Sequence, residues 1–376
     1  MKTELALHGR TLTLHRFPKR HNETLQAWDA GDEYLINYME ELNIGTGKNI
    51  LIINDNFGVL SCWFSEQHQV TMMSDSYIAH QATQQNLQYN HCPNIVLENT
   101  MGLIPSEVDY VLMQIPRNNR HLVWLLSQLR QYIPNSVPVI AVNKAKEIHT
   151  STLKLFEKYL GTTTTSLAWK KHRLVFSQAN SLHPVPIEPS TCWSVEQHGF
   201  ELENLPNVYS GEKLDQGARF MLEHLPTNLS DKRVIDLGCG NGVLSLKMGL
   251  LNPQIQITCI DESFMATESA RRNLSNTLGK ERNFQCLTNN CLDGFTFASA
   301  DLVVCNPPFH QQQAITDHIA WQMFCDTKHV LSNGGQLLVI GNRHLSYDVK
   351  LSKLFGKQNV KLVASNKKFV ILQATK

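Results

Sequence analysis

One ordered series of short segments occurs twice in this chain of 376 residues, and the repetition constrains the fold more than any other feature. Corresponding segments follow one another in the same order in both halves, at an offset of about 190 residues. The matched segments are residues 52–61 and 234–245, 70–77 and 257–264, 86–87 and 273–274, 108–112 and 300–304, 154–156 and 353–355, and 170–171 and 367–368. One such match can arise by chance, but an ordered series across both halves indicates a duplicated domain.

A proline-rich segment separates the two halves. Residues 181–190 contain Pro184, Pro186 and Pro189, and proline keeps such a connection extended. We therefore predict a first domain over residues 1–180, a linker over 181–190 and a second domain over 191–376. Each domain is long enough to bury a hydrophobic core of its own.

Short apolar runs rich in β-branched residues alternate with helical patterns in each half. In the second half the predicted strands are residues 233–237, 255–261, 284–288, 301–305, 335–340, 360–365 and 368–374. The predicted helices there are residues 243–251, 264–277, 316–331 and 346–355, and residues 191–210 are predicted to be irregular or a hairpin. This alternation predicts a mostly parallel sheet covered on both faces. Because Asn366 and Lys367 alone join the last two strands, those strands form a hairpin and the terminal strand is antiparallel.

Composition places the chain among soluble globular proteins. Hydrophobic residues make up 42% of it, mean hydropathy is −0.24 and the net charge is +1. The nine cysteines include no Cys-x-x-Cys pair, and Cys259 and Cys305 lie in apolar runs that favour a buried, reduced thiol. No apolar stretch is long enough to span a bilayer, and the first residues lack the apolar core of a secretory signal. We therefore expect a cytoplasmic, monomeric protein without a structural metal site or a membrane contact.

The second half has a glycine-rich loop where a predicted strand ends and a helix begins. Asp236 and Leu237 precede Gly238, Gly240 and Gly242. Glycines at such a turn let the backbone approach a ligand closely, at the carboxyl edge of the sheet where doubly wound folds bind cofactors. The spacing differs from the Gly-x-Gly-x-x-Gly of dinucleotide sites, and no Gly-Lys-Ser/Thr follows for phosphates.

Two acidic residues indicate what this loop binds. Asp236, before the glycines, suits a cationic amino-acid group better than a pyrophosphate. Asp261 ends the next predicted strand, where a carboxylate can accept hydrogen bonds from both hydroxyls of a ribose. A purely structural glycine turn is the alternative to this interpretation.

A second motif, Asn306-Pro307-Pro308-Phe309, follows the predicted strand 301–305. Two prolines cannot continue a central strand, and they stiffen its exit. The amide of Asn306 and the ring of Phe309 are thereby held near the glycine loop. A rigid proline turn with a buried aromatic residue is the alternative.

Together, these motifs resemble the S-adenosyl-L-methionine pocket and acceptor site of class I methyltransferases that act on a planar exocyclic nitrogen. The resemblance implies an α/β fold with two tandem class I (Rossmann-like) methyltransferase domains and S-adenosyl-L-methionine as cofactor. It also implies catalytic roles for Asn306, Pro307 and Phe309: the Asn306 oxygen and the Pro307 carbonyl accept the amine hydrogens, and Phe309 stacks on the base.

The same resemblance assigns the cofactor contacts. Residues 214–217 resemble the segment that covers the cofactor, and Asn289 or Asn290 would meet its adenine, with a simple turn role as the alternative for both. The residues implied to bind the cofactor are Asp215, Asp236, Gly238, Gly240, Gly242, Asp261, Asn289 and Asn290.

The tetrapeptide alone leaves the acceptor open, because adenine N6, cytosine N4, guanine N2 and glutamine methyltransferases use related motifs. His310 and the later Asn342-Arg343 resemble the tandem-domain ribosomal RNA guanine-N2 methyltransferases. Within that family, residues 306–321 and 341–347 look most like the enzymes that methylate RNA of the large ribosomal subunit. The resemblance covers essentially the whole chain. It implies N2 of a guanine of 23S rRNA, at the position numbered 1835, as the acceptor.

Other functions stay open at this point. Guanine N2 of 16S rRNA, adenine N6 and a protein glutamine are alternative acceptors. An RNA-binding ribosome-assembly factor is the alternative outside enzymes, and the intact glycine loop and tetrapeptide argue against it.

The first half lacks residues that the chemistry requires. Asn54 is expected to stand for Asp236, only Gly58 remains of the three glycines, and residues 114–117 replace the tetrapeptide with Gln-Ile-Pro-Arg. We predict that this half neither binds the cofactor nor catalyses methyl transfer.

Basic residues are concentrated in the same half. Residues 105–175 contain ten Lys or Arg and four Asp or Glu, a net charge of +6. Such a window in a nearly neutral chain favours RNA binding. A solvated surface, or a relic domain that only stabilises its partner, is the alternative. The candidate RNA contacts are Arg117, Lys144, Lys170, Lys171 and Arg343.

Overall fold

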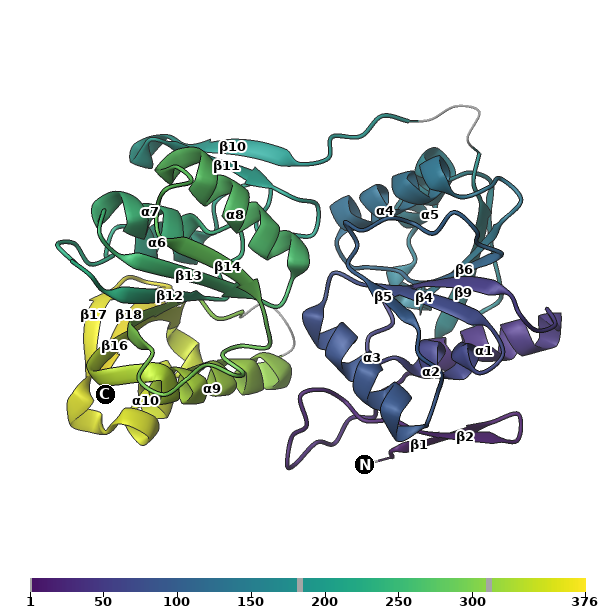
Figure 1. Ribbon diagram of the computed structural model, residues 1–376, viewed down its shortest axis with the longest axis horizontal. Coiled ribbons are helices and arrows are strands. Elements are labelled where there is room, and N and C mark those ends of the chain that lie inside the picture. Colours follow the sequence, from purple (N-terminus) through teal and green to yellow (C-terminus); the bar gives the residue numbers. More distant parts are fainter. Residues whose placement is uncertain (1, 181–184, 309–312) are drawn as a thin grey trace. The chain divides into compact units, whose positions relative to one another are not determined.

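The computed structural model describes residues 2–180, 185–308 and 313–376, and it leaves the side chains of residues 313–316 undescribed. The chain forms two compact units, Met1–Pro189 and Ser190–Lys376, both drawn in Figure 1. Each unit is built on a seven-stranded sheet that is mostly parallel and has helices on both faces. The predicted class, two α/β domains with mixed sheets, is confirmed.

The C-terminal unit follows the predicted order of elements. Its strands are β10 Thr191–Val195, β11 Phe200–Asn204, β12 Arg233–Leu237, β13 Gln256–Asp261, β14 Phe284–Thr288, β15 Ala300–Cys305, β16 Leu331–Asn342, β17 Val360–Ser365 and β18 Phe369–Thr375. Its helices are α6 Gln216–Leu222, α7 Val243–Leu251, α8 Phe264–Leu278, α9 Gln313–Val330 and α10 Tyr347–Phe355. The sheet order is β14-β13-β12-β15-β16-β18-β17, with β18 antiparallel between β16 and β17. β10 and β11 form a separate hairpin.

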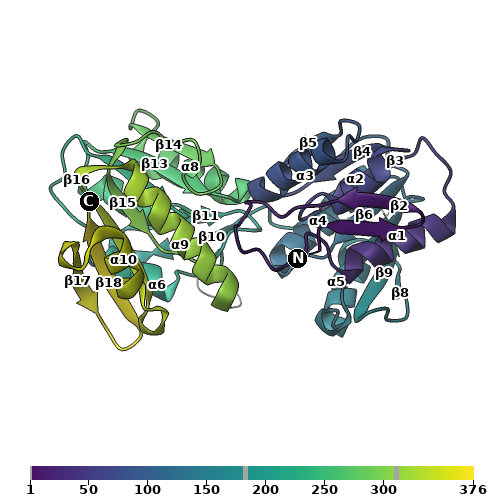
Figure 2. The same cartoon turned by 90° about the horizontal axis from the view of Figure 1, so that it is seen from below.

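Successive side chains of the central strands face two different helical layers. Val234 and Ile257 pack in one core with α6, α7 and α8, whereas Ile235 and Ile260 pack in another with α9 and α10. Figure 2 shows α9 lying along its face of the sheet. Because both faces are covered, polar ligands can reach the sheet only at its ends, and the carboxyl ends of β12, β13 and β15 meet at one edge.

The N-terminal unit repeats this topology. Its strands are β1 Glu4–Leu7, β2 Arg10–Thr13, β3 Asn49–Ile53, β4 Gln69–Met73, β5 Val96–Glu98, β6 Tyr110–Gln114, β7 Pro138–Lys144, β8 Thr163–Thr165 and β9 His172–Gln178. Its helices are α1 Ala30–Leu42, α2 Val59–Ser65, α3 Tyr77–Tyr89, α4 Asn119–Tyr132 and α5 Thr150–Tyr159. The sheet order β5-β4-β3-β6-β7-β9-β8 matches that of the second unit strand for strand.

A buried asparagine braces the first strand-to-helix loop of the C-terminal unit. The Asn273 amide, on α8, donates to the carbonyls of Asn241 and Glu203, each at 2.9 Å. Its oxygen accepts a hydrogen bond from the Glu203 backbone N–H at 2.8 Å. One side chain therefore ties α8, the loop before α7 and the end of β11 together.

The N-terminal unit uses the same device. Asn86, on α3, donates to the carbonyls of Phe57 and His15 at 2.7 and 2.8 Å and accepts from the His15 backbone N–H at 2.9 Å. Fully satisfied buried networks of this kind are specific, because each missing partner would cost free energy. Their recurrence at matched positions is independent support for duplication.

The structure adds elements that the sequence pattern did not reveal. α6 begins in residues 214–217, which the resemblance marks only as a cover over the cofactor, and continues to Leu222; β16 begins four residues before the predicted 335. The β1–β2 hairpin was not predicted either. Short elements of this kind carry too few residues for a clear hydrophobic period.

Three further observations bear on the class of protein. None of the helices in the described ranges combines the length and apolar character needed to cross a membrane. Within residues 2–180, 185–308 and 313–376, no three His, Cys, Asp or Glu side chains group as a metal site would require. All nine cysteines are free thiols.

We predict that Gly242→Ala destabilises the C-terminal unit by about 3 kcal/mol. Gly242 has φ +79°, and a methyl group there would lie 2.9 Å from Cβ of Ala270 on α8. Left-handed strain and overpacking each cost about 1–3 kcal/mol. Gly240→Ala is the matched control, because it has φ +53° but open space around the added carbon. Urea unfolding followed by circular dichroism measures both, and equal midpoints for the two variants would contradict the packing argument.

Candidate active site

The glycine loop of the C-terminal unit connects β12 directly to α7. Gly238, Gly240 and Gly242 have φ of +76°, +53° and +79°. The backbone N–H groups of Gly238 and Cys239 donate to the carbonyl of Ile260 at 2.8 and 2.9 Å, which ties the loop to the end of β13. All three glycines therefore adopt the left-handed conformation, which glycine reaches without the steric cost of a Cβ.

The three glycines have different surroundings. A Cβ at Gly242 would collide with α8, and one at Gly238 would lie 3.2 Å from Cε of Met323. A Cβ at Gly240 would meet no atom within 4 Å. Gly242 is thus required by helix packing, whereas Gly240 borders open space that a ligand can approach.

Asp236 is the buried acid of the site. Its side chain is 1% exposed, and one carboxylate oxygen accepts from the backbone N–H and the hydroxyl of Ser245 at 3.1 and 2.8 Å. Burial raises the pKa of Asp236 to about 6. The group is therefore mainly ionised at neutral pH but close to titration, and it provides the negative charge that a cationic ligand would favour.

Asp261 braces the same loop from the end of β13. One of its oxygens accepts from the Gly240 backbone N–H at 2.9 Å, and the other accepts from the Ser263 backbone N–H at 3.0 Å. Burial raises the pKa of Asp261. The backbone N–H of Glu262 also donates to this carboxylate. Because a carboxylate has about four lone-pair sites, the three bonds leave capacity for a hydroxyl donor.

The two candidate asparagines after β14 differ. Asn290 is buried, where its amide donates to Asp293 at 2.7 Å and its oxygen accepts from Gln322 at 3.3 Å. Asn289 lies at the surface and donates to the backbone carbonyl of Asp293 at 2.8 Å. Asn289 is therefore the more accessible of the pair.

Asn306 stands at the exit of β15, next to the start of α6. Its amide nitrogen donates to a carboxylate oxygen of Asp215 at 3.4 Å. The amide oxygen, Oδ1, is buried and has no hydrogen-bond partner among the described residues. Gly217 also lies at this corner: a Cβ there would lie 3.0 Å from Oδ2 of Asp215 and 3.7 Å from Oδ1 of Asn306. Pro307 is buried and Pro308 exposed, whereas Phe309 and His310 lie outside the described residues.

Asp215 was expected among the cofactor residues, and its contacts link it to the acceptor motif. It is the N-cap of α6, accepting from the Ala218 backbone N–H at 3.0 Å, and it also accepts from the Tyr209 hydroxyl at 3.3 Å. The contact between Asp215 and Asn306 spans 91 positions and was not predicted. The repeat contained a signal that could have marked Asp215 as part of the duplicated site: Asp29 and Gly31 before β3 have the same spacing as Asp215 and Gly217.

The matching corner of the N-terminal unit is altered throughout. The predicted alignment of Asn54 with Asp236 is wrong. Strand register places Ile52, not Asn54, where Asp236 stands. Asn54 instead occupies the position of Gly238 and keeps its left-handed backbone, with φ +63°. In the C-terminal unit Asp236 accepts hydrogen bonds from Ser245 of α7. In the N-terminal unit Asp55 has this role, because its carboxylate accepts from the backbone N–H and hydroxyl of Ser61 of α2, each at 2.7 Å.

In the N-terminal unit, two further positions lack the side chains that the catalytic copy uses. Ser74 stands at the position of Asp261, as the contact of its hydroxyl with the Ser76 backbone N–H indicates. At the end of β6, the amide of Gln114 donates to buried Asp32, so the counterpart of the Asn306 corner is closed by an internal hydrogen bond. These replacements support the prediction of an inactive copy.

Four candidate RNA contacts gather at one edge of the N-terminal sheet. Arg117 follows β6, Lys144 ends β7, and Lys170 and Lys171 precede β9 next to Lys144. All four are exposed, and Lys170 also forms a 2.8 Å ion pair with Glu33.

The basic window also needs a correction. It includes Arg130, which is buried and donates to the carbonyl of Lys158 at 2.8 Å, so this charge is structural. The fifth candidate, Arg343, follows β16 in the other unit. Its guanidinium donates to the carbonyl of Asn366 at 2.7 Å and braces the β17–β18 turn.

Comparisons with known proteins divide the chain at the same place. Residues 2–181 match the family model described as the RLMG N-terminal domain. Residues 199–373 match the model described as the methyltransferase small domain.

Curated relatives match over the full length. A protein of Vibrio parahaemolyticus serotype O3:K6 (strain RIMD 2210633), named ribosomal RNA large subunit methyltransferase G, is 67% identical over 100% of this chain and 98% of its own length. A protein of the same name from Vibrio cholerae serotype O1 (strain ATCC 39541 / Classical Ogawa 395 / O395) is 65% identical over 100% of both chains.

A solved structure extends the likeness to the fold. The T. thermophilus 16S rRNA N2 G1207 methyltransferase, in complex with AdoMet and guanosine, matches 100% of this chain and 97% of its own. The TM-score is 0.75 and the identity 19%, so this match shows the fold, which is that of two tandem class I methyltransferase domains.

The predicted enzyme class, a methyltransferase that uses S-adenosylmethionine, is confirmed by these matches. Because full-length relatives share 65 to 68% of its residues, the chain belongs to the ribosomal RNA large subunit methyltransferase G family.

Proposed function

We propose that this protein methylates the exocyclic N2 of one guanine in 23S rRNA, the position numbered 1835 that the sequence resemblance implies. The carboxamide of Asn306 carries the proposal. Its nitrogen is committed to Asp215, and its buried oxygen has no partner among the residues that the structure describes. An unsatisfied buried acceptor costs about 1–3 kcal/mol, so an amine hydrogen of the substrate would relieve a cost built into the site.

The residues around the glycine loop fit S-adenosylmethionine. Open space beside Gly240 allows a ligand to approach the backbone, and Asp236 supplies negative charge for a cationic amino-acid group. Asp261 accepts from three backbone N–H groups and keeps capacity for a ribose hydroxyl, and half-buried Asn289 is accessible for the adenine. When bound, the cofactor supplies a methyl group on a positively charged sulfur.

The protein's task in this reaction is to orient a weak nucleophile. The lone pair of an exocyclic guanine amine is delocalised into the ring. Hydrogen bonds to Oδ1 of Asn306 and to the Pro307 carbonyl favour a more tetrahedral nitrogen, whose lone pair then points at the methyl carbon. With S-adenosylmethionine held at the glycine loop, methyl transfer would replace its sulfur–carbon bond with a nitrogen–carbon bond, and the amine proton, made acidic by alkylation, would leave to solvent. Orientation and exclusion of water supply most of the rate. Phe309 is the proposed stacking partner.

We assign RNA binding to the N-terminal unit. Exposed Arg117, Lys144 and Lys171 gather at the ends of β6 and β7, the counterparts of β15 and β16 on the acceptor side of the catalytic copy. The replacements at Ile52 and Ser74 argue against cofactor binding in this unit. Phosphates of a folded RNA suit such a charged edge. We further propose a cytoplasmic monomer, with rRNA as its macromolecular partner and no metal ion.

Mapping N2-methylguanine in rRNA from cells with and without this protein tests the acceptor. Loss of one N2-methylguanine from 23S rRNA is the expected result. Loss from 16S rRNA, a missing N6-methyladenine or a missing methylglutamine would each overturn the assignment in favour of another acceptor. Purified protein that binds rRNA but not S-adenosylmethionine would indicate an assembly factor instead.

Asn306→Ala and Asn306→Asp should each lower kcat by about 10² to 10³, the usual effect of losing one oriented hydrogen-bond partner of a transition state. The aspartate keeps the shape but cannot donate to Asp215. Affinity for S-adenosylmethionine, measured by calorimetry, should be unchanged in both variants. Turnover close to wild type in either variant would contradict the proposed orientation of the amine.

We expect affinity for S-adenosylmethionine to fall as pH decreases through about 6. Asp236 has its pKa raised to about 6, and protonation removes the charge that favours a cationic ligand. Calorimetric titrations between about pH 5 and pH 8 measure this effect. Asp236→Asn should bind more weakly at neutral pH and show a smaller pH dependence, and a flat wild-type profile would rule out the assigned role.

The double variant Lys144→Gln/Lys171→Gln should bind 23S rRNA fragments with a shallower salt dependence. Each phosphate contact contributes about 0.7 to the slope of log K against log salt for single strands, so the slope should decrease by about 1.4. Lys158→Gln is the control for loss of a positive charge elsewhere in the basic window, because Lys158 lies at the end of α5 away from Lys144 and Lys171. Identical slopes for both variants would favour a unit that only stabilises its partner.

A further inference from the structure

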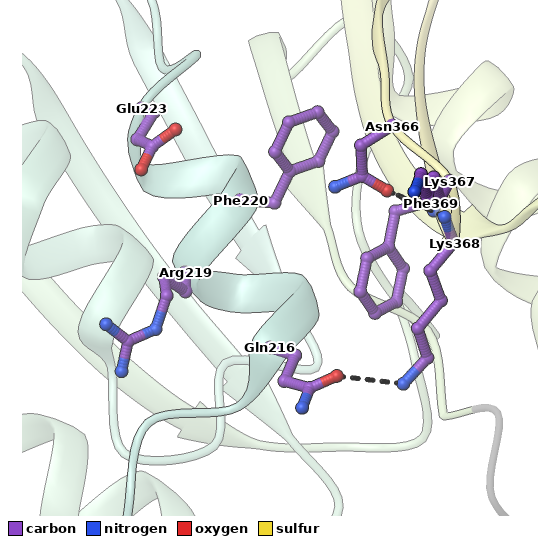
Figure 3. Close-up of a pocket in the computed structure, with 8 residues that line it drawn as sticks. All are labelled: Gln216, Arg219, Phe220, Glu223, Asn366, Lys367, Lys368 and Phe369. Atoms are coloured by element: carbon purple, nitrogen blue, oxygen red, sulfur yellow. Dashed lines mark hydrogen bonds between the residues drawn. The ribbon is translucent and has the colours of Figure 1, made fainter.

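A recess lies beside the acceptor corner of the C-terminal unit. It has a volume of about 470 Å³, within the range of small-ligand sites, and it lies between α6 and the turn that joins β17 to β18. Figure 3 shows its lining, with the ring of Phe220 directed from α6 toward Asn366. The residues that line it are Gln216, Arg219, Phe220, Glu223, Asn366, Lys367, Lys368 and Phe369.

The recess is connected to Asn306 through shared residues. Gln216, which follows Asp215 in the chain, accepts a hydrogen bond from Lys368 at 2.9 Å (Figure 3). A Cβ at Gly217 would lie 3.5 Å from the ring of Phe369 and 3.7 Å from Oδ1 of Asn306. A molecule in the recess would therefore be a direct neighbour of the acceptor held at Asn306.

The chemistry of the lining is that of a nucleotide site. Lys367, Lys368 and Arg219 supply positive charge, and the half-buried ring of Phe220 supplies aromatic surface, with buried Phe369 beneath it in the core. Within the described ranges, no ion pair engages Lys367 or Arg219. The acid Glu223 lies two helical turns from Gln216, so a phosphate is favoured at the Gln216 and Lys368 end. Exposed cations beside a stacking surface are typical of single-stranded RNA binding.

The N-terminal unit provides an internal comparison, because its matching corner is closed. Glu33 and Tyr34 stand where Arg219 and Phe220 stand, counted from the helix caps Asp29 and Asp215.

Tyr34 packs against Trp169 with ring centroids 5.4 Å apart, and its hydroxyl donates to the carbonyl of Leu167 at 3.0 Å. Lys170, the counterpart of Lys367, is neutralised by Glu33 at 2.8 Å. Duplication has thus left the recess open and positive only in the catalytic copy.

We propose that this recess binds the nucleotide adjacent to the target guanine, with its phosphate near Lys367 and Lys368 and its base on Phe220. This inference rests on the proposed function. Arg343 positions the site without being required to contact RNA, because its guanidinium and backbone N–H hold Asn366 and Lys368 in the turn. The recess would align the RNA chain so that the target amine reaches Asn306, and it would contribute to the choice of site.

The test is a double-mutant cycle that combines a change at Phe220 with removal of a base next to the target guanine. Methylation is measured with short 23S rRNA fragments that are intact, or abasic on the 5′ or the 3′ side of the target guanine. For wild-type protein, one abasic substitution should lower kcat/KM about tenfold, the ordinary contribution of a stacked base. Phe220→Ala should show the same tenfold loss on intact RNA and no further loss on that abasic RNA.

Controls separate this inference from general damage. Phe297→Ala removes another exposed ring, before the amino end of β15, and should leave kcat/KM unchanged. Arg219→Glu places a carboxylate opposite Lys367, as Glu33 lies opposite Lys170, and should raise KM for RNA more than Arg219→Gln does. Affinity for S-adenosylmethionine should stay at wild-type values throughout. Phe220→Ala should lower thermal stability, because its ring packs against the core of the unit, so every variant is assayed well below its unfolding midpoint.

The outcomes distinguish the two proposals. If Phe220→Ala lowers kcat/KM by the same factor on intact and both abasic RNAs, or not at all, the recess is not a nucleotide site, while methylation by the wild-type protein still supports the proposed function. If the wild-type protein forms no N2-methylguanine on intact RNA, the proposed function itself fails.

Discussion

The short turn from the first strand of each sheet to its first helix is the constraint on which the rest of the structure depends. In the C-terminal unit the turn needs three left-handed residues in a row of five, and it packs so closely on α8 that Gly242 cannot carry a side chain. Asn273 then fixes the turn from the neighbouring helix. With the backbone held in this way, the edge of the sheet presents free space at Gly240 and a carboxylate at Asp236.

The two copies show how little must change to remove the chemistry while keeping the architecture. Gly58 and Asn86 preserve the turn and its brace, so the N-terminal fold is intact. Isoleucine at position 52 and serine at position 74 remove both carboxylates of the cofactor edge. The network of backbone and buried hydrogen bonds is shared, whereas the groups that face solvent or ligand have diverged.

Asn306 illustrates a different use of buried polarity. Its amide nitrogen is satisfied by Asp215, which also caps α6, so the orientation of the carboxamide is fixed by a residue that the helix needs anyway. The oxygen is left without a partner among the described residues. A protein selected for stability alone would pair this atom, and leaving it unpaired is understandable if a substrate amine completes the bond.

The sequence by itself determined the duplication, the order of strands and helices in the catalytic copy, and the glycine loop with its acids, because these depend on local periodicity and on residues close together in the chain. It also indicated the inactive copy, although it aligned Asn54 with Asp236 when strand register places Ile52 there. The short helix α6 escaped prediction because seven residues give no clear period.

Only the tertiary structure decided which candidates meet. The contact of Asp215 with Asn306, the burial of Arg130, and the open recess beside Phe220 join residues far apart in sequence. The first and the last of these arise from the packing of α6 against β16 and β18, and the burial of Arg130 arises from the packing of α4 against α5; no local pattern encodes either packing.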